Sequence, residues 1–192
     1  MADSKELPKK LFRDKKALDD WLEKNHSRST GLWLRIAKKE SGRKSVTYPE
    51  ALESVLCYGW IDGQKKPESE TTWLQKITPR AKRSMWSQIN CEKARGLIAK
   101  GLMRPPGLAE IERAKADGRW ENAYESFSSA TVPPDFEKAL QKSQRARAAF
   151  EALTRTLRYS VLWNIHTAKK PETRERRIRN FVERLEKRGT VR

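Results

Sequence analysis

Residues 59–90 constrain the fold most, because they combine two short extended runs with a change to helical spacing. The extended runs lie at about 60–66 and 72–78, and the PESET segment between them fits a hairpin connection. An earlier run, LWLRIAKK, begins at Leu32 and alternates with the period of two that is typical of a half-buried strand, with Leu32, Leu34 and Ile36 on one side and Trp33 and Arg35 on the other. The three runs predict a small antiparallel sheet of about three strands, near the minimum that is stable when helices cover it.

Helical patterns surround this predicted sheet. Asp14 is placed to cap a helix that runs to about Asn25, and residues 1–10 before it are expected to fray. Thr47 and Glu50 have the spacing of a capping box, which predicts the start of a second helix. Further helices are predicted over 84–100 with Ser84 as the cap, and over 105–117, 135–142, 144–153, 157–168 and from Pro171 onward.

A loop-forming segment divides the chain. Residues 128–134, SSATVPP, consist mainly of residues that favour loops and form the best candidate linker. We therefore predict an α+β fold in two parts. Residues 1–127 form an α+β core in which helices pack on the small antiparallel sheet, and residues 135–192 form an all-helical C-terminal segment.

Positive charge is the strongest feature of the composition. The net charge is +17 and the isoelectric point is near 10.1. Residues 76–104 contain eight lysines and arginines against one acid, and residues 169–192 contain ten against four. Such a balance predicts attraction to polyanions, so the expected partner is an acidic protein or a nucleic-acid backbone.

A nucleic-acid interface would use the basic residues Lys82, Arg83, Lys93 and Arg95. They are accompanied by no zinc-finger spacing, no RNA-recognition aromatic signature and no helix-turn-helix pattern. Binding would therefore be directed at phosphates and would weaken steeply with salt. A solvated basic surface without a partner explains the same residues and is the simpler interpretation.

The polar residues of 59–90 form the candidate ligand site. A carboxylate, guanidinium groups, an amide and aromatic walls can together hold a small anionic or amide-bearing ligand. The structural alternative, which the sequence favours, is an ion pair between Asp62 and Arg80, a helix cap at Ser84 and tryptophans in the core. The candidate set is Trp60, Asp62, Gln64, Arg80, Arg83, Ser84, Trp86 and Asn90.

Catalytic and metal-binding patterns are largely missing from the sequence. It contains no Gly-rich phosphate loop, no HExxH, no CxxC and no nucleophile elbow. Its two histidines and two cysteines are scattered, so we expect no metal site and no cofactor. Cys91 has basic neighbours that would favour its thiolate form, but no histidine lies near it in the sequence.

Three further observations bear on the location of the protein. No apolar run approaches the roughly 20 residues that span a bilayer. The first ten residues lack the apolar region of a secretory signal. Cys57 and Cys91 suggest no disulfide framework and fit a reducing compartment. The expected location is the cytoplasm.

Several segments carry a family resemblance. The strongest are TYPEALESVLCYGWIDGQKK at 47–66, the TPR–S–WS–N pattern at 78–90 and GLMRPPGLAEIERAKADGRW at 101–120, followed by RYSVLWNIHTAKKPETRERRI at 158–178. Together they resemble the YdeI/OmpD-associated family, also called bacteriocin-protection proteins, over roughly residues 10–190.

The resemblance implies a link to tolerance of antimicrobial peptides or envelope stress, and it implies no established enzymatic activity. The first expectation is therefore a non-enzymatic intracellular binding protein. One alternative is sequence-independent nucleic-acid binding through the basic surface. The other is a small-molecule enzyme built on Asp62, Arg80, Ser84 and Asn90.

Overall fold

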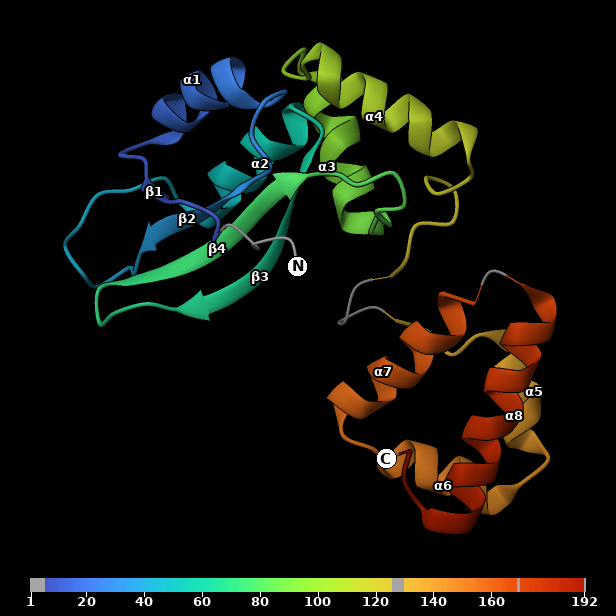
Figure 1. Cartoon of the computed structure of the whole chain (residues 1–192). Coiled ribbons are helices and arrows are strands. Elements are labelled where there is room, and N and C mark those ends of the chain that lie inside the picture. Colours follow the sequence, from blue (N-terminus) through green and yellow to red (C-terminus); the bar gives the residue numbers. More distant parts are fainter. Residues whose placement is uncertain (1–5, 126–129, 169, 192) are drawn as a thin grey trace. The chain divides into compact units, whose positions relative to one another are not determined.

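A four-stranded sheet with helices packed on it forms the N-terminal part of the chain (Figure 1). The computed structural model describes residues 6–125, 130–168 and 170–191. The chain divides into an N-terminal unit, residues 1–123, and a C-terminal unit, residues 124–192. The N-terminal unit contains β1 (Lys9–Leu11), α1 (Lys15–Asn25), β2 (Leu32–Ala37), α2 (Tyr48–Cys57), β3 (Trp60–Pro67), β4 (Thr72–Pro79), α3 (Gln88–Ala99) and α4 (Pro105–Ala116). The C-terminal unit contains α5 (Pro134–Gln141), α6 (Gln144–Ala152), α7 (Arg155–His166) and α8 (Pro171–Arg188).

The α+β fold class is confirmed, but the sheet has four strands instead of about three. The strand order is β1-β2-β4-β3. The pairs β2–β4 and β4–β3 are antiparallel, as expected, whereas β1 pairs with β2 in parallel, so the sheet is mixed. The additional strand lies partly within residues 1–10, which were expected to fray. It has three exposed residues and no alternation, so backbone pairing to β2 defines it rather than a local sequence pattern.

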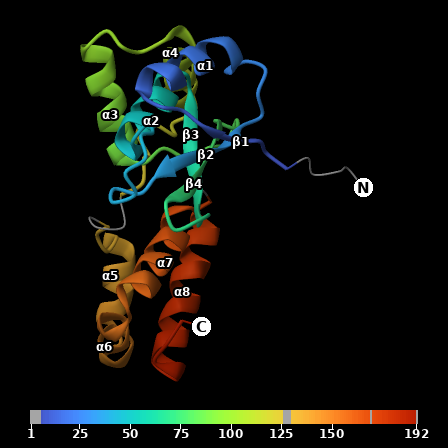
Figure 2. The same cartoon turned by 90° about the vertical axis from the view of Figure 1, so that its left-hand side faces the viewer.

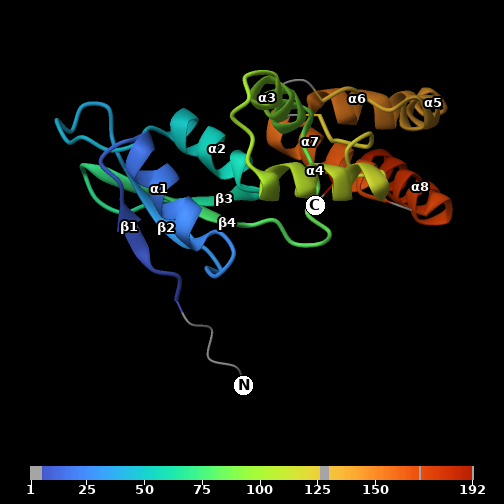
Figure 3. The same cartoon turned by 90° about the horizontal axis from the view of Figure 1, so that it is seen from above.

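The main core of the N-terminal unit lies on one face of the sheet. Leu32, Leu34 and Ile36 of β2 point into it, as the period-two pattern predicted, and they are almost completely buried. Helices α1 to α4 add to this core, as do Trp60 of β3, Ile77 of β4 and residues of the connecting segments. Figure 3 shows α2 on one side of β3 and β4.

The first two helices begin where the sequence predicted. The side chain of Asp14 accepts a hydrogen bond of 2.8 Å from the backbone N–H of Ala17, which caps α1. Thr47 and Glu50 form the predicted capping box of α2, and the Glu50 carboxylate accepts from the Thr47 backbone N–H at 2.8 Å. These caps satisfy N–H groups that would otherwise lack a partner at the helix start.

Helix α3 starts later than the sequence indicated. Ser87 caps it by accepting from the backbone N–H of Asn90, so Ser84 is not the helix cap. Ser84 instead closes a turn, because its hydroxyl accepts from the N–H of Ala81 at 3.0 Å and its own N–H donates to the Ala81 carbonyl. Trp86 consequently precedes the helix.

The C-terminal unit has its own hydrophobic core. Phe136 of α5 and Phe150 of α6 meet edge to face at a centroid distance of 5.2 Å, beside Ile165 of α7 and Leu185 of α8. Figure 2 shows how the four helices of this unit are arranged. Residues 128 and 129 of the expected linker lie outside the described residues.

Two arginines of α8 close the end of α7. Arg174 donates to the carbonyl of Ile165 at 3.0 Å and forms a two-pronged ion pair with Asp135. Arg177 donates to the carbonyl of Asn164 and to the hydroxyl of Thr167. Carbonyls at the end of a helix have no partner within the helix, so these contacts join α7 to α8.

Gly107 allows α4 to lie against the end of α2, and its replacement tests this close contact. A Cβ atom at Gly107 would collide with the backbone carbonyl of Cys57. We expect Gly107→Ala to lower the free energy of unfolding by about 1–3 kcal/mol. Gly96, inside α3, is the matched control because a Cβ there meets nothing within 4 Å. Gly96→Ala should raise stability by about 0.5–1 kcal/mol in urea unfolding, and equal effects would contradict the contact.

The ion pair between Arg35 and Glu68 predicts a pH dependence of stability. Both guanidinium–carboxylate hydrogen bonds are 2.6 Å long, and they lower the pKa of Glu68 from 4.5 to about 2. Because folding lowers this pKa, the carboxylate stabilises the fold above about pH 4.5, and the contribution is lost as the pH falls toward about 2. Glu68→Gln should therefore destabilise the protein at about pH 7 and by less than half as much at about pH 3. Exposed Glu70 serves as the control, since Glu70→Gln should leave urea unfolding unchanged at both pH values.

Candidate functional site

Trp60 lies at the start of β3 and belongs to the core of the N-terminal unit. Its side chain is only 1% exposed. The indole N–H donates to the carbonyl of His26 at 3.2 Å, and the ring meets Trp21 edge to face at a centroid distance of 5.9 Å. Trp60 therefore anchors β3 to the segment that follows α1.

Asp62 has a partner other than the predicted one. Its carboxylate accepts a hydrogen bond of 2.8 Å from the phenol of Tyr48, at the start of α2. Burial and this hydrogen bond raise the pKa of Tyr48 above its ordinary value, so the phenol stays protonated. The structure has no ion pair between Asp62 and Arg80 among its described residues. Gln64 lies in an irregularity of the β3–β4 pairing between Asp62 and Lys65, and it is exposed.

Arg80 is buried against an aromatic ring. Only 7% of the residue is exposed, and the guanidinium carbon lies 3.5 Å from the ring centroid of Trp86. One guanidinium nitrogen donates to the carbonyl of Met85 at 3.1 Å. Trp86 packs in turn against Trp120, with centroids 4.8 Å apart. This stack holds the loop between β4 and α3 against the core.

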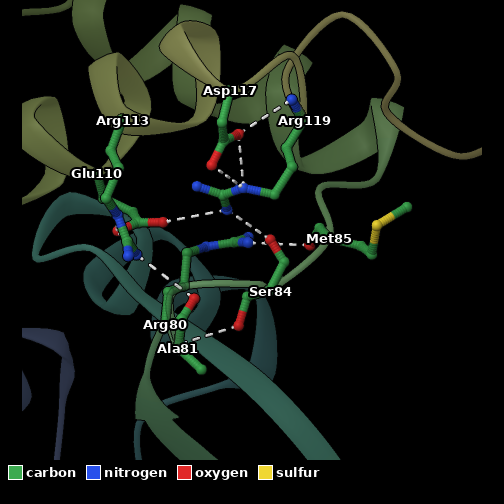
Figure 4. Close-up of polar contacts among 8 residues, drawn as sticks. All are labelled: Arg80, Ala81, Ser84, Met85, Glu110, Arg113, Asp117 and Arg119. Carbon is green, nitrogen blue, oxygen red and sulfur yellow. Dashed lines mark hydrogen bonds and ion pairs between the residues drawn. The ribbon is translucent and has the colours of Figure 1, made fainter. Parts of the chain in front are cut away.

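Arg119, which the sequence analysis did not single out, is the centre of a second buried network (Figure 4). Its guanidinium donates to both carboxylate oxygens of Asp117 at 2.8 Å and to the carbonyl of Ser84 at 2.7 Å. A further nitrogen–oxygen distance, 3.6 Å, joins it to Glu110. Arg119 is 5% exposed, so most of this charge is removed from water and depends on these partners.

Arg113 completes this network from α4. Two of its nitrogens donate to Oε2 of Glu110, whereas Arg119 lies nearest Oε1, and it also donates to the carbonyl of Ala81 at 3.4 Å (Figure 4). The acid–arginine spacing of Glu110 and Arg113 could have indicated a pair on one helix face. Their contacts to the loop at 81–84, more than 30 residues away, leave no local pattern in the sequence.

The residues of the candidate set thus lie in two separate regions of the N-terminal unit. Arg80, Ser84 and Trp86 come together around the loop after β4, while Trp60 and Asp62 contact α1, α2 and the segment between α1 and β2. Asn90 is 8% exposed in the first turn of α3, and Arg83 is exposed to solvent. Within the set, the protein itself engages the carboxylate of Asp62 through Tyr48 and the guanidinium of Arg80 through Trp86 and the Met85 carbonyl.

A pocket of about 430 Å³ lies beside α3, and Cys91 is in its lining. Gln88, Arg95 and Trp120 also line it. The expectation that basic neighbours favour the Cys91 thiolate is wrong in direction. Burial outweighs Arg95 and Arg80 and raises the pKa of the thiol to about 11. The thiol is therefore protonated near neutral pH and is a poor nucleophile.

The four basic residues of the predicted nucleic-acid interface lie in different local environments. Lys82 and Arg83 are exposed in the loop before α3. Arg95 is exposed on α3, with its guanidinium carbon 5.4 Å from the ring centroid of Trp120, and Lys93 is half-buried. Two residues apart on a helix, Lys93 and Arg95 point in very different directions.

In residues 6–125, 130–168 and 170–191, no group of three or more His, Cys, Asp or Glu side chains is arranged to hold a metal ion. None of the helices in those ranges has the length and apolar character needed to cross a membrane.

Replacing Arg119 tests whether the buried network is structural. Arg119→Gln removes the guanidinium from Asp117 and Glu110, so we expect the free energy of unfolding to fall by about 3 kcal/mol. Exposed Arg83 is the control, and Arg83→Gln should change it by less than about 0.5 kcal/mol. Urea unfolding followed by circular dichroism measures both. A stable Arg119→Gln variant would show that the network has little structural role.

Two family models match the chain. The first, a domain of unknown function (DUF8412), matches residues 10–110 and thus more than half of the chain. The second, described as bacteriocin-protection, YdeI or OmpD-associated, matches residues 129–188 and is the family that the sequence resembles. The GWIDGQ and TPR–S–WS–N segments lie in the part matched by the first model. No curated protein and no solved structure matches the chain. The chain therefore belongs to the DUF8412 family and carries a YdeI/OmpD-associated, bacteriocin-protection domain at residues 129–188.

Proposed function

We propose that this protein is a non-enzymatic, cytoplasmic binding protein whose partner is a polyanion, with nucleic acid as the partner that fits best. The observation behind this proposal is the division of its arginines and lysines into two groups. Arg80, Arg119, Arg174 and Arg177 are occupied by contacts within the protein. The remaining basic surface still exceeds what the acidic residues can neutralise, because the net charge is +17.

Exposed cations without an ion pair are available to phosphates. Lys82, Arg83 and Lys100 are exposed, and none of them forms an ion pair within the described residues. Phosphate contacts of this kind release counterions and require no base recognition. The proposal therefore predicts binding that depends on charge and salt and little on base sequence.

An enzyme built on Asp62, Arg80 and Asn90 has less support. Asp62 accepts from Tyr48 while Arg80 stacks on Trp86, so the acid and the guanidinium are engaged in different contacts. The protonated thiol of Cys91 offers no activated nucleophile near them.

The match at residues 129–188 favours a role in protection against bacteriocins as a second candidate. Amphipathic antimicrobial peptides commonly carry lysines and arginines on their polar face. A protein with a net charge of +17 repels such peptides, so direct capture is disfavoured. Protection would then act through an anionic partner in the cell, as the first proposal already requires.

A gel shift at two salt concentrations tests the proposed function. The full chain should bind mixed-sequence nucleic acid at about 50 mM salt and bind it at least about tenfold more weakly at about 200 mM. Two unrelated base sequences should give similar affinities. The absence of binding at the lower salt concentration would exclude nucleic acid as the partner.

A further inference from the structure

The sheet of the N-terminal unit has a second face, which carries a compact group of aromatic and basic residues. Lys9, Trp33 and Lys76 are direct neighbours across β1, β2 and β4. Adjacent strands lie about 4.8 Å apart, so the two lysines stand on either side of the tryptophan. The next row in register, with the same orientation, consists of Leu11, Arg35, Leu74 and Lys66. We call these two rows the open sheet face.

Trp33 and Leu74 are buried on this face although they are not part of the main core. They are 8% and 1% exposed, and neither belongs to the core cluster that includes Leu32, Leu34 and Ile36. The ammonium group of Lys66 lies 4.1 Å from the ring centroid of Trp33. The side chain of Lys66 therefore covers part of the indole ring on this face of the sheet.

The charges of the open sheet face are predominantly positive. Arg35 is engaged with Glu68 in two hydrogen bonds, so this acid is already paired. Lys9, Lys66 and Lys76 form no ion pair within the described residues. The face thus presents three unneutralised ammonium groups around one indole ring.

We propose that the open sheet face binds single-stranded nucleic acid, with phosphates held by Lys9, Lys66 and Lys76 and a base stacked on Trp33. This inference rests on the proposed function and names the surface and the form of nucleic acid. Lys66 moves from the indole to a phosphate, which exposes the ring to the base. The exchange replaces one cation–π contact with an ammonium–phosphate contact and a stacked base, so two contacts form for the one that is lost.

The central tryptophan distinguishes among anionic partners. Carboxylates of an acidic protein can pair with the lysines, but the face of an aromatic ring carries partial negative charge and repels them. An unpaired base presents a π-face that stacks on the indole. In a duplex, neighbouring bases already cover that π-face, so the tryptophan favours single strands.

A second tryptophan–lysine pair lies near the turn of the β3–β4 hairpin. The ammonium group of Lys65 lies 4.5 Å from the ring centroid of Trp73. Lys38, Lys65, Lys66, Pro67 and Trp73 line a pocket of about 530 Å³. Lys66 belongs both to this pocket and to the open sheet face, so the basic and aromatic surface continues around the hairpin.

The test compares charge removal at two places on the full chain. The face variant is Lys9→Gln, Lys66→Gln and Lys76→Gln. The matched control is Lys24→Gln, Arg28→Gln and Arg104→Gln, three exposed cations that form no ion pair within the described residues. Fluorescence anisotropy with a labelled single strand and with its duplex gives the affinities over a salt series. The face variant should lose at least about tenfold in single-strand affinity at low salt, and its salt slope should fall by about two. The control should lose clearly less.

Replacing the indole separates stacking from charge. Trp33→Leu should weaken single-strand binding by about tenfold and leave duplex binding unchanged. Trp33→Phe keeps an aromatic ring and should retain most of the affinity. Trp33→Met replaces Trp33→Leu as the non-aromatic variant if the leucine protein does not fold. Thermal unfolding by circular dichroism establishes that each variant is folded before its affinity is measured.

Several outcomes would overturn the inference. Equal losses in the face and control variants, with the wild type still bound, would reject this surface and leave the proposed function standing. No binding by the wild type to either form of nucleic acid at low salt would reject both. Binding to polyglutamate that depends on the three lysines, without nucleic-acid binding, would assign the face to an acidic protein. A folded Trp33→Leu or Trp33→Met that binds as tightly as the wild type, or a stronger loss for the duplex, would reject base stacking.

Discussion

Arginine guanidinium groups stabilise each of the two units from within, through contacts with carbonyls, carboxylates and an aromatic ring. Arg80 stacks on Trp86, and Arg119 joins the loop after β4 to α4. Arg174 and Arg177 close the end of α7 in the C-terminal unit. A guanidinium suits such positions because it is planar, remains charged and offers five donors that carbonyls and carboxylates can satisfy. Part of the high arginine content is therefore structural, and the charge available to a partner is smaller than the composition suggests.

The elements that the sequence predicted correctly have local signals. The alternation of β2 and the capping box of α2 are each contained in a few consecutive residues. β1 lacks such a signal, because its three exposed residues form a strand only through pairing with β2. Ser84 and Ser87 both fit the local rule for a helix cap, and only the turn around Ala81 decides between them.

The candidate site was harder to predict than the fold. Arg80, Ser84 and Trp86 were identified from the sequence, but Arg119, which donates to the Ser84 carbonyl, was not. Glu110 and Arg113, which belong to the network of Arg119, were also missed. These contacts join segments that are far apart in the sequence, and spacing rules describe only near neighbours. Period-two alternation also placed Trp33 and Arg35 on the side of β2 opposite the core, yet it could not show that lysines from three other strands surround them.

The two edges of the sheet affect how the protein behaves at high concentration. β1, at one edge, has three residues, and two of them are lysines. β3, at the other edge, has an irregular pairing between Asp62 and Lys65, followed by Lys66. A strand from a second molecule would meet like charges and an interrupted register at either edge. The sheet is thereby protected against edge-to-edge growth into fibrils, even though it carries several large aromatic residues.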